Sequence, residues 1–386
     1  MSKIIHFLPS FKVTGLCLLS GFMGILITDM PSIASTIKDI EFIGKATFAT
    51  DTQVQNTQLG GLSGITYNPN KNVFYSVSDD RSQNNSARFY TLTIDVNERS
   101  LGAIKFTDVT FLKNQEGQNF PALSLDPEGI AFTNKGSVFI SSEGDATAAN
   151  LTNPFVREFS LTGKHLQALP IPPKYLPTKQ QTSGTRNNLA FESLTIAPSQ
   201  KYLFTATENA LIQDGAVATV NNGSLSRILR FNLDTNKPAA EYLYITDKVA
   251  APPTTANGLN NNGLVDLLAI DDKHLISLER SFSLGAGTTI KLYELFLEEA
   301  EDISNIASLK TVDIKSIKAV KKKLILNFDK LNLALDNIEG LTFGPNLTDG
   351  RRSLIVVSDN NFSPTQKTQF IVFSVGVTPK AYNEQR

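Results

Sequence analysis

The chain has 386 residues, with 36 Lys or Arg against 37 Asp or Glu, and 41% of its residues are hydrophobic. This is the composition of a folded globular protein, and it excludes a disordered or a membrane-embedded chain. The net charge of −1 and the lack of a long basic run argue against a nucleic-acid partner.

Residues 1–34 predict a cleavable signal peptide. Basic residues precede the apolar stretch 13–27, and Ser32 and Ala34 form the small-x-small pattern of a signal peptidase site, with cleavage after Ala34. The apolar stretch is shorter than the roughly 20 residues that a membrane span requires, which disfavours the alternative of a membrane anchor. We therefore expect a secreted or periplasmic protein without stable membrane insertion.

Residues 35–386 would then form the mature protein, which we expect to be a single domain and a monomer. The only cysteine, Cys17, lies inside the predicted signal peptide, so the mature chain would contain no disulfide and no reactive thiol. Its stability must then come from a large hydrophobic core, which a chain of this length can bury.

Five segments of the chain repeat one pattern: an apolar run of strand length, a polar turn and a second apolar run. The turns, for example 68–72 and 271–273, separate the two runs as in a β-hairpin. Most segments continue with two weaker strands, such as 89–94, and a repeated four-stranded unit is typical of a β-propeller blade. A β-sandwich would also contain hairpins, but it would not require five copies of the same one.

We therefore predict an all-β fold, a β-propeller of five four-stranded blades. The run 40–48 lies outside the five repeats and would supply the outer strand of the last blade. A sixth blade remains an alternative, located in the irregular region 297–328.

Acidic residues recur at fixed places in these repeats. The first runs open at Ser63, Glu128, Glu192, Asp266 and Glu339, and the second runs close at Asp79, Glu143, Glu208, Glu279 and Asp359. The start of one strand lies beside the end of its antiparallel partner, so each hairpin brings its own acids together. Radial repetition then brings all nine carboxylates to one face, around the mouth of the central channel.

So many carboxylates at one mouth repel each other unless cations neutralise them or some of them stay protonated. A hard cation with oxygen ligands, Ca²⁺ above all, is one solution. Arginines close to the acids in the sequence are the other, and the candidates are Arg81, Arg88, Arg157, Arg186 and Arg280. A structural role also remains open for any single acid, because such acids also cap turns or bind the backbone of the next blade.

All nine acids and four of the arginines receive a predicted role. Catalysis is assigned to Glu128, Glu192 and Glu339. Metal ligation is assigned to Asp79, Glu143, Glu208, Asp266, Glu279 and Asp359. Substrate binding is assigned to Arg81, Arg157, Arg186 and Arg280.

The mature chain has too few histidines for a zinc site or a Ser-His-Asp triad. His6 falls in the signal peptide and His274 in a turn, which leaves only His165. The chain also has no nucleophile elbow, P-loop or dinucleotide fingerprint, so metal-assisted phosphoester hydrolysis fits better than acyl transfer through a serine.

The acidic motifs resemble those of the phytase-like β-propeller family, known as "esterase-like activity of phytase". The motifs are Asp126-Pro-Glu-Gly-Ile-Ala131, Phe191-Glu-Ser-Leu194, Leu278-Glu-Arg280, Asn337-Ile-Glu-Gly-Leu341 and Ser358-Asp-Asn-Asn-Phe362, and the resemblance extends from about Leu59 to Val375. It implies an exported propeller that hydrolyses phosphate or other esters. The chain has no Trp, whereas alkaline propeller phytases carry a motif ending in Trp, so phytate is not the expected substrate.

Two hypotheses follow from the sequence. In the first, the protein is a metal-dependent hydrolase of small-molecule phosphoesters or other esters, with Ca²⁺ held by the acids and arginines binding the substrate. In the second, it is a non-catalytic propeller that binds a ligand or an envelope partner at the same acidic mouth. Carboxylates clustered around a cation would favour the first hypothesis, and carboxylates fully paired with arginines would favour the second.

Overall fold

The computed structural model describes residues 36–147 and 150–378. They belong to one compact unit, Thr36–Arg386. The predicted signal peptide lies outside the described residues and stays a prediction.

The described residues form five four-stranded antiparallel sheets, the blades. Blade 1 contains β4 (Leu62–Asn68), β5 (Val73–Ser78), β6 (Arg88–Val96) and β7 (Leu101–Phe111). Blade 2 contains β8 (Pro127–Phe132), β9 (Ser137–Ser142), β12 (Phe155–Ser160) and β13 (His165–Leu169). Blade 3 contains β14 (Thr195–Ile196), β15 (Tyr202–Ala206), β16 (Leu225–Asn232) and β17 (Lys237–Ile245). Blade 4 contains β18 (Asn260–Ala269), β19 (His274–Ser283), β20 (Gly287–Phe296) and β21 (Lys321–Asn327). Blade 5 contains β22 (Asn337–Asn346), β23 (Arg352–Asp359), β24 (Thr368–Val377) and β1 (Ile37–Phe48).

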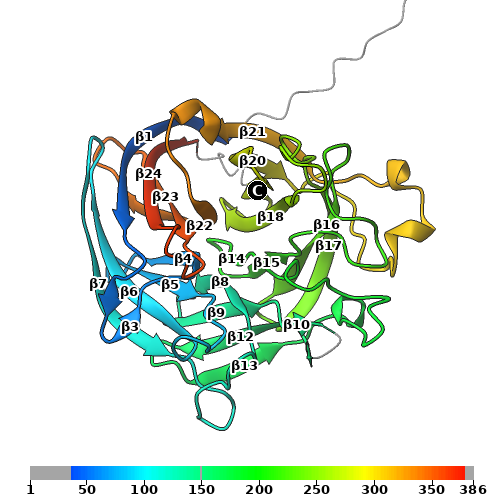
Figure 1. The fold of residues 1–386 in the computed structure, drawn as a ribbon, viewed down its shortest axis with the longest axis horizontal. Coiled ribbons are helices and arrows are strands. Elements are labelled where there is room, and N and C mark those ends of the chain that lie inside the picture. The colour runs from blue at the N-terminus through cyan, green and yellow to red at the C-terminus, as the bar shows by residue number, and fades with distance from the viewer. Residues whose placement is uncertain (1–35, 148–149, 379–386) are drawn as a thin grey trace, which may run out of the picture. The chain divides into compact units, whose positions relative to one another are not determined.

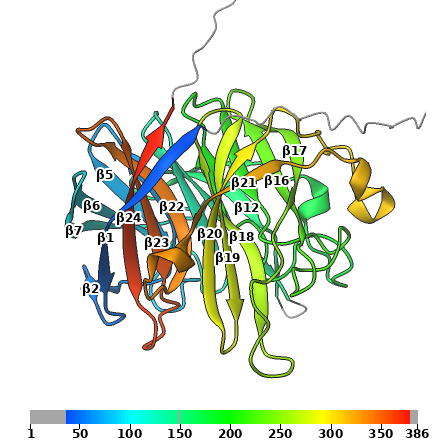
Figure 2. The same ribbon diagram turned by 90° about the horizontal axis from the view of Figure 1, so that it is seen from above.

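The blades form a ring that both ends of the chain close. The inner strands β4, β8, β14, β18 and β22 surround the centre in Figure 1, and β22 contacts β4. The outer strand of blade 5 is β1, which pairs with β24 and sets Ile40 opposite Val375 and Phe48 opposite Thr368. The predicted fold class is therefore confirmed, and so is the use of the N-terminal run as the missing outer strand. Figure 2 shows the strands of blades 4 and 5 running from one face of the ring to the other.

The hydrophobic core is divided into clusters that lie between neighbouring blades. Strand residues point alternately to the two faces of a sheet, and in a propeller both faces are covered by the adjacent blades. The cluster between blades 5 and 1, for example, joins Phe74 and Leu92 of blade 1 with Ile355 and Phe370 of blade 5. Corresponding clusters lie at the other four blade interfaces. Burial of this apolar surface stabilises the ring by roughly 25 cal/mol per Å².

The region 297–328 does not form a sixth blade. It contains the 3₁₀ helices η2 (Leu309–Thr311) and η3 (Ile314–Ser316), and then β21, the outer strand of blade 4. Leu309 and Ile303 pack against Leu243 of blade 3 and so cover its outer edge. The remaining short elements are β2 (Gln53–Val54), β3 (Thr57–Gln58), β10 (Asp145–Ala146), β11 (Leu151–Thr152), η1 (Pro173–Tyr175) and η4 (Phe328–Leu331). Within 36–147 and 150–378, every helix is too short and too polar to span a lipid bilayer.

Candidate functional site

A cavity of about 560 Å³ opens where the inner strands begin. Its charged lining residues are the acids Asp79, Asp80, Asp126, Glu128, Glu192, Glu339 and Asp359 and the arginines Arg81 and Arg280. Asparagines, Gln83 and two phenylalanines, Phe282 and Phe362, complete the lining. We call this space the acidic cavity. It contains members of all three predicted groups, the catalytic, metal-binding and substrate-binding residues.

A β-bulge in the inner strand directs the acid of blade 5 into the cavity. The pairing of β22 with β23 passes from Ile338 opposite Ser358 to Gly340 opposite Val357, which leaves Glu339 as the extra residue. A bulge of this kind turns one side chain away from the regular alternation of the strand. The inner strands β4, β8 and β18 are irregular at the corresponding place. In these four blades the bulge therefore decides which residue reaches the channel mouth.

In blade 4 the bulge places different residues at the mouth from those predicted. The pairing of β18 with β19 passes from Leu264 opposite Glu279 to Asp266 opposite Leu278, so Val265 is the extra residue and corresponds to Glu339. One pair earlier, Arg280 lies opposite Gly263, as Asp359 lies opposite Asn337 in blade 5. The prediction that Asp266 and Glu279 line the acidic mouth is therefore wrong by one residue in each strand.

Asp266 instead joins two blades. Its carboxylate accepts hydrogen bonds from the backbone N–H of Leu267 and, across the blade interface, from that of Leu341, both at 2.8 Å. Burial raises the pKa of Asp266 well above its usual range, against the effect of these hydrogen bonds. This acid has the structural role, binding to the backbone of the next blade, that the sequence left open.

Glu279 lies in a buried polar network between blades 3 and 4. It accepts hydrogen bonds from the Tyr244 hydroxyl at 2.6 Å, from the Asp247 backbone N–H at 2.8 Å and from Asn262 at 2.8 Å. The ammonium of Lys322 lies 2.5 Å from its Oε1. Its charge is therefore balanced locally, and the carboxylate has no part in the acidic cavity.

Arg280 takes the place of an acid and binds the acids of its neighbours. It forms an ion pair and hydrogen bond with Glu339, donates to Asn337, and lies 3.6 Å from Oε1 of Glu208. Burial lowers the pKa of Arg280, but the carboxylates of Glu339 and Glu208 outweigh burial and raise it above its usual value. The guanidinium is thus held in its charged form next to these carboxylates.

Opposite this arginine, three carboxylates converge with little compensation. Asp126, Glu128 and Glu143 are buried, and each offers an oxygen within 4.8 Å of the others. Oε1 of Glu143 accepts from the backbone N–H of Ala190, whereas its Oε2 is buried and has no hydrogen-bond partner among the described residues. We call these three residues the carboxylate triad. Buried, convergent oxygens with an unsatisfied atom fit a hard divalent cation such as Ca²⁺.

The nearby Arg81 neutralises the carboxylate triad only in part. Its Nη2 donates to Oδ2 of Asp145 at 2.8 Å, and its Nε lies 3.5 Å from Oδ2 of Asp126. The side chain is therefore shared between the triad and an acid outside it. A buried ion pair below it, Arg88 with Asp80 at 2.7 Å, anchors the loop that carries Arg81, because Asp80 also accepts the backbone N–H groups of residues 83–85.

The carboxyl groups of the acidic cavity hold protons more tightly than usual. Burial raises the pKa of Asp126 to about 7, against the opposing effect of Arg81. Burial, followed by the Glu339 charge, raises the pKa of Asp359 to about 8. For Glu128 and Glu192, burial and then the neighbouring carboxylates raise the pKa well above its usual range. These acids cannot all be ionised at neutral pH unless a cation joins them.

Two of the predicted substrate-binding arginines lie away from the cavity. Arg157 belongs to β12 and stacks on Phe155, with 4.0 Å between its Cζ and the ring centroid. Arg186 donates to the backbone carbonyls of Ala210 at 3.1 Å and Gly215 at 2.7 Å and so holds a loop. Proximity in sequence to an acid did not place either side chain at the mouth, because neither belongs to an inner hairpin.

The structure adds residues that the prediction of site residues omitted. One of them is Asp126. It lies two residues before Glu128, and this close spacing of two acids is the sequence feature that could have identified it. Asn188, Asn361 and Phe362 line the cavity with backbone φ angles of 56°, 47° and 51°, in the left-handed region, which asparagine tolerates but phenylalanine rarely adopts. Backbone strain such as that at Phe362 collects at functional sites.

Known proteins with similarity to this chain include a distant relative and solved structures of low similarity. A relative from Arthroderma benhamiae, named "Uncharacterized secreted protein", is 26% identical over an alignment of 223 residues that covers 50% of this chain and 41% of that protein. This chain thus spans less than half the length of that relative. Among solved structures, an endo-arabinase from Bacteroides thetaiotaomicron is 14% identical with a TM-score of 0.42, covering 87% of this chain and 98% of its own. The periplasmic gluconolactonase of Pseudomonas aeruginosa is 11% identical with a TM-score of 0.33, covering 81% and 84%.

The family model "Phytase-like: Esterase-like activity of phytase" matches residues 57–362. The match begins just before blade 1 and ends at Phe362, on the rim of the acidic cavity. It covers well over half of the chain, including every inner hairpin. The chain therefore belongs to the phytase-like family.

Proposed function

We propose that the protein is a metal-dependent hydrolase of small phosphoesters or other esters, with the acidic cavity as its active site. The observation that carries the proposal is the imbalance of charge in this cavity. The carboxylate triad and its neighbours face only two guanidinium groups, and Arg81 is shared with an acid outside the cavity. The family model, with its esterase-like description, supports the same reaction class.

The carboxylate triad would hold the cation, with Ca²⁺ as the expected ion. A bound divalent cation polarises an ester or phosphoryl oxygen and lowers the pKa of a bound water. Asp126, Glu128 and Glu143 supply only oxygen ligands, as this class of cation prefers. We assign the metal-binding role to these three residues, which include Glu128, predicted from the sequence to be catalytic.

The arginines would bind the anionic oxygens of the substrate. Arg81 and Arg280 both line the cavity, and each has a buried Nε–H without a hydrogen-bond partner among the described residues. Guanidinium groups bind phosphate and carboxylate oxygens through paired hydrogen bonds. The ion pair with Glu339 holds Arg280 in place, so we assign Glu339 a positioning role instead of the predicted catalytic one.

Glu192 is the proposed general base. It lines the cavity and makes no ion pair with any residue in the described part of the chain. Burial, together with the carboxylates of Glu143 and Glu208, raises the pKa of Glu192 well above its usual range, so its ionised carboxylate is a stronger base than that of an ordinary glutamate. Asp359, whose pKa burial and Glu339 raise to about 8, is the second group in the cavity suited to proton transfer.

The test is a hydrolysis screen of the purified protein with added Ca²⁺ and with chelator. Aryl phosphates, phosphodiesters and short acyl esters serve as substrates. We expect activity with at least one class that chelator removes and Ca²⁺ restores, and Glu192→Gln should lower kcat by about 10²- to 10⁴-fold. Glu158→Gln, a buried acid in blade 2 outside the cavity, is the matched control. Activity that survives chelator, or that Glu192→Gln leaves intact, contradicts the proposal.

A non-catalytic binding role is the second candidate. It is favoured by Arg280, which already pairs with Glu339 and approaches Glu208. Under this reading the cavity binds a cationic ligand or an envelope partner, and the screen finds no turnover while Ca²⁺ or the ligand still raises the melting temperature.

We also propose that the protein is exported and acts as a monomer on a small molecule. The support is the N-terminal signal-peptide pattern and the printed name of the relative from Arthroderma benhamiae, which calls it secreted. Mass analysis of material recovered outside the cytoplasm should give a chain that begins at Ser35. An intact Met1 on that material would contradict the proposal.

A further inference from the structure

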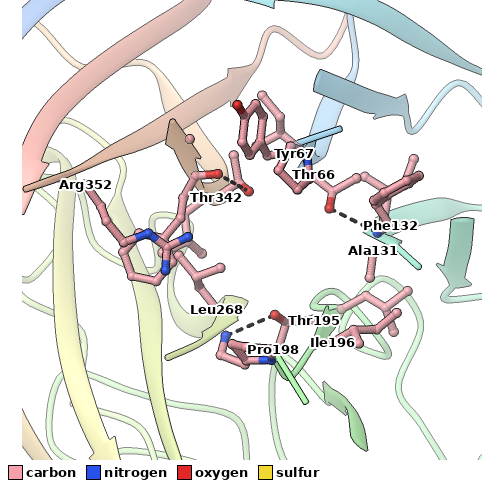
Figure 3. Close-up of a pocket in the computed structure, with 18 of the residues that line it drawn as sticks. Thr66, Tyr67, Ala131, Phe132, Thr195, Ile196, Pro198, Leu268, Thr342 and Arg352 are labelled. Carbon is pink, nitrogen blue, oxygen red and sulfur yellow. Dashed lines mark hydrogen bonds between the residues drawn. The ribbon is translucent and has the colours of Figure 1, made fainter. Parts of the chain in front are cut away.

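A second cavity, of about 730 Å³, lies at the other ends of the inner strands. The turns that connect inner strands to their partners contribute Asn70, Asn134, Pro198 and Gln200 to its lining. It shares no lining residue with the acidic cavity. Figure 3 shows side chains from all parts of the ring around this opening, with Arg352 on one side and Phe132 and Ala131 on the other. We call it the distal cavity.

The distal cavity contains a single charge. Among the described residues that line it, Arg352 is the only one that is charged. Its guanidinium stacks on Phe343, with 3.9 Å between Cζ and the ring centroid, and makes no hydrogen bond or ion pair with any described residue. The adjacent Arg351, outside the cavity, pairs with Asp349 and Glu41. Arg351 is thus paired with two acids, whereas Arg352, which lines the cavity, is paired with none in the described part of the chain.

Arg352 is half-buried and has no anionic partner among the described residues. Burial lowers the pKa of Arg352, because a guanidinium that loses water without gaining an anion is destabilised. Stacking on Phe343 compensates only in part, because an aromatic ring offers the guanidinium no hydrogen-bond acceptor oxygen. A guanidinium can donate two parallel hydrogen bonds to the two oxygens of a carboxylate. The guanidinium of Arg352 is therefore suited to bind an anion in this cavity.

The rest of the lining is apolar or neutral, and hydrogen bonds and ring packing position parts of it. Aliphatic side chains from the inner strands and the rings of Tyr67 and Phe132 form the walls. Tyr67 packs on Phe74 with ring centroids 4.8 Å apart, and its hydroxyl donates to Asn72 at 2.8 Å. Thr66 accepts the backbone N–H of Phe132 at 3.0 Å and so ties two blades together at the rim. A preformed pocket of this size and polarity is typical of small-molecule sites.

We propose that the distal cavity binds a small organic carboxylate with an apolar body, with Arg352 on the carboxylate and Tyr67 and Phe132 against the body. This site is independent of the acidic cavity and of the hydrolase proposal. A doubly charged phosphate group fits less well, because the lining offers one cation and no second one. A purely structural role for Arg352, stacking on Phe343, is the alternative.

The experiment uses phenylacetate as the probe and phenylacetamide as its uncharged counterpart. Binding of both to the purified protein is followed by calorimetry, in chelator so that a cation in the acidic cavity cannot capture the carboxylate. We expect phenylacetate to bind about 10- to 100-fold more tightly than the amide, since a hydrogen bond to a charged group contributes about 1.5–3 kcal/mol. Arg352→Gln should remove this difference.

Arg230→Gln is the matched control, because Arg230 also stacks on an aromatic ring, that of Tyr202, at 4.7 Å and lies outside both cavities. It should bind phenylacetate like the wild type. The proposal is overturned if phenylacetate shows no saturable binding, if the amide binds equally well, or if Arg352→Gln binds phenylacetate as tightly as the wild type. If the melting curve shows that Arg352→Gln does not fold, Arg352→Lys takes its place in the experiment. This variant keeps the charge but loses the paired donors, so we expect it to bind phenylacetate with intermediate affinity.

Discussion

Arg280 of blade 4 occupies the position that Asp359 occupies in blade 5: each lies opposite the residue two places before the bulge of its inner strand. One arginine therefore replaces one acid in a ring of otherwise repeated carboxylates. Its ion pair with Glu339 gives the neighbouring carboxylates a fixed cation, while the carboxylate triad has only the shared Arg81. The two groups of acids therefore differ in charge balance, and the triad is the one suited to a cation.

Arg280→Gln should strongly destabilise the protein without metal. The change leaves Glu339 and Glu208 buried without their counter-charge, and removal of one partner from a buried pair costs about 3–5 kcal/mol. Urea unfolding in chelator measures this loss, and added Ca²⁺ should recover part of it. Arg157→Gln, which removes a stacked arginine outside the cavity, should cost much less. Equal losses in the two variants would mean that the ion pair has no special role.

Glu192→Gln and Glu339→Gln should differ in metal-free stability. Glu192 has like-charged neighbours and no ion pair in the described chain, so its neutral variant should be as stable as the wild type or more stable. Glu339 binds Arg280 and Asn337, so Glu339→Gln should lose about 1.5–3 kcal/mol. Thermal melts in chelator compare the two. A destabilised Glu192→Gln would indicate a structural role for that acid.

The metal-free protein should lose stability as the pH rises. The pKa of Asp359 is raised to about 8 and that of Asp126 to about 7 in the folded state, chiefly by burial, against an ordinary value of 3.8. The folded chain then binds more protons than the unfolded chain between these limits, so the free energy of unfolding falls from about pH 4 to about pH 8. Chelated melts across this range should show the fall. A stability that rises with pH would contradict the raised pKa values.

The stabilisation by Ca²⁺ should follow the opposite trend. Protonated carboxyl groups are poor ligands, so the shift in melting temperature caused by Ca²⁺ should be small near pH 5 and larger near pH 8. Glu143→Gln removes one member of the carboxylate triad and should reduce this shift at every pH. Melts that Ca²⁺ leaves unchanged throughout would remove the support for a metal site.

Asp266→Asn tests the acid that the structure moves out of the cavity. The carboxylate accepts backbone N–H groups from two blades, and the amide can replace only one of its oxygens, so we expect a loss of about 1–2 kcal/mol. The loss should be the same with Ca²⁺ and with chelator, because the side chain does not line the acidic cavity. If Asp266→Asn changed the stabilisation by Ca²⁺, Asp266 would take part in cation binding after all.

The blades could be predicted because the information for them is local. A hairpin needs two apolar runs and a turn, as in 62–78, and five copies of it imply radial repetition. The pairing of β1 with the last blade was predictable as well, because the run 40–48 had no other partner. For the same reason the acids of four hairpins could be expected at one mouth, since strand direction alone decides the end at which they lie.

Only the tertiary structure decided which residues of blade 4 reach the cavity and which carboxylates are compensated there. A bulge moves every later side chain to the other face, and nothing in Val265-Asp266 or in Glu279-Arg280 marks the residue at which it occurs. Charge balance depends on contacts between blades far apart in sequence, such as Asp266 with Leu341 or Arg280 with Glu339. The sequence by itself determined the blades and the face that carries the acids. The register at each bulge and the partners across each blade interface depend on packing of the closed ring, and they set the chemistry of both cavities.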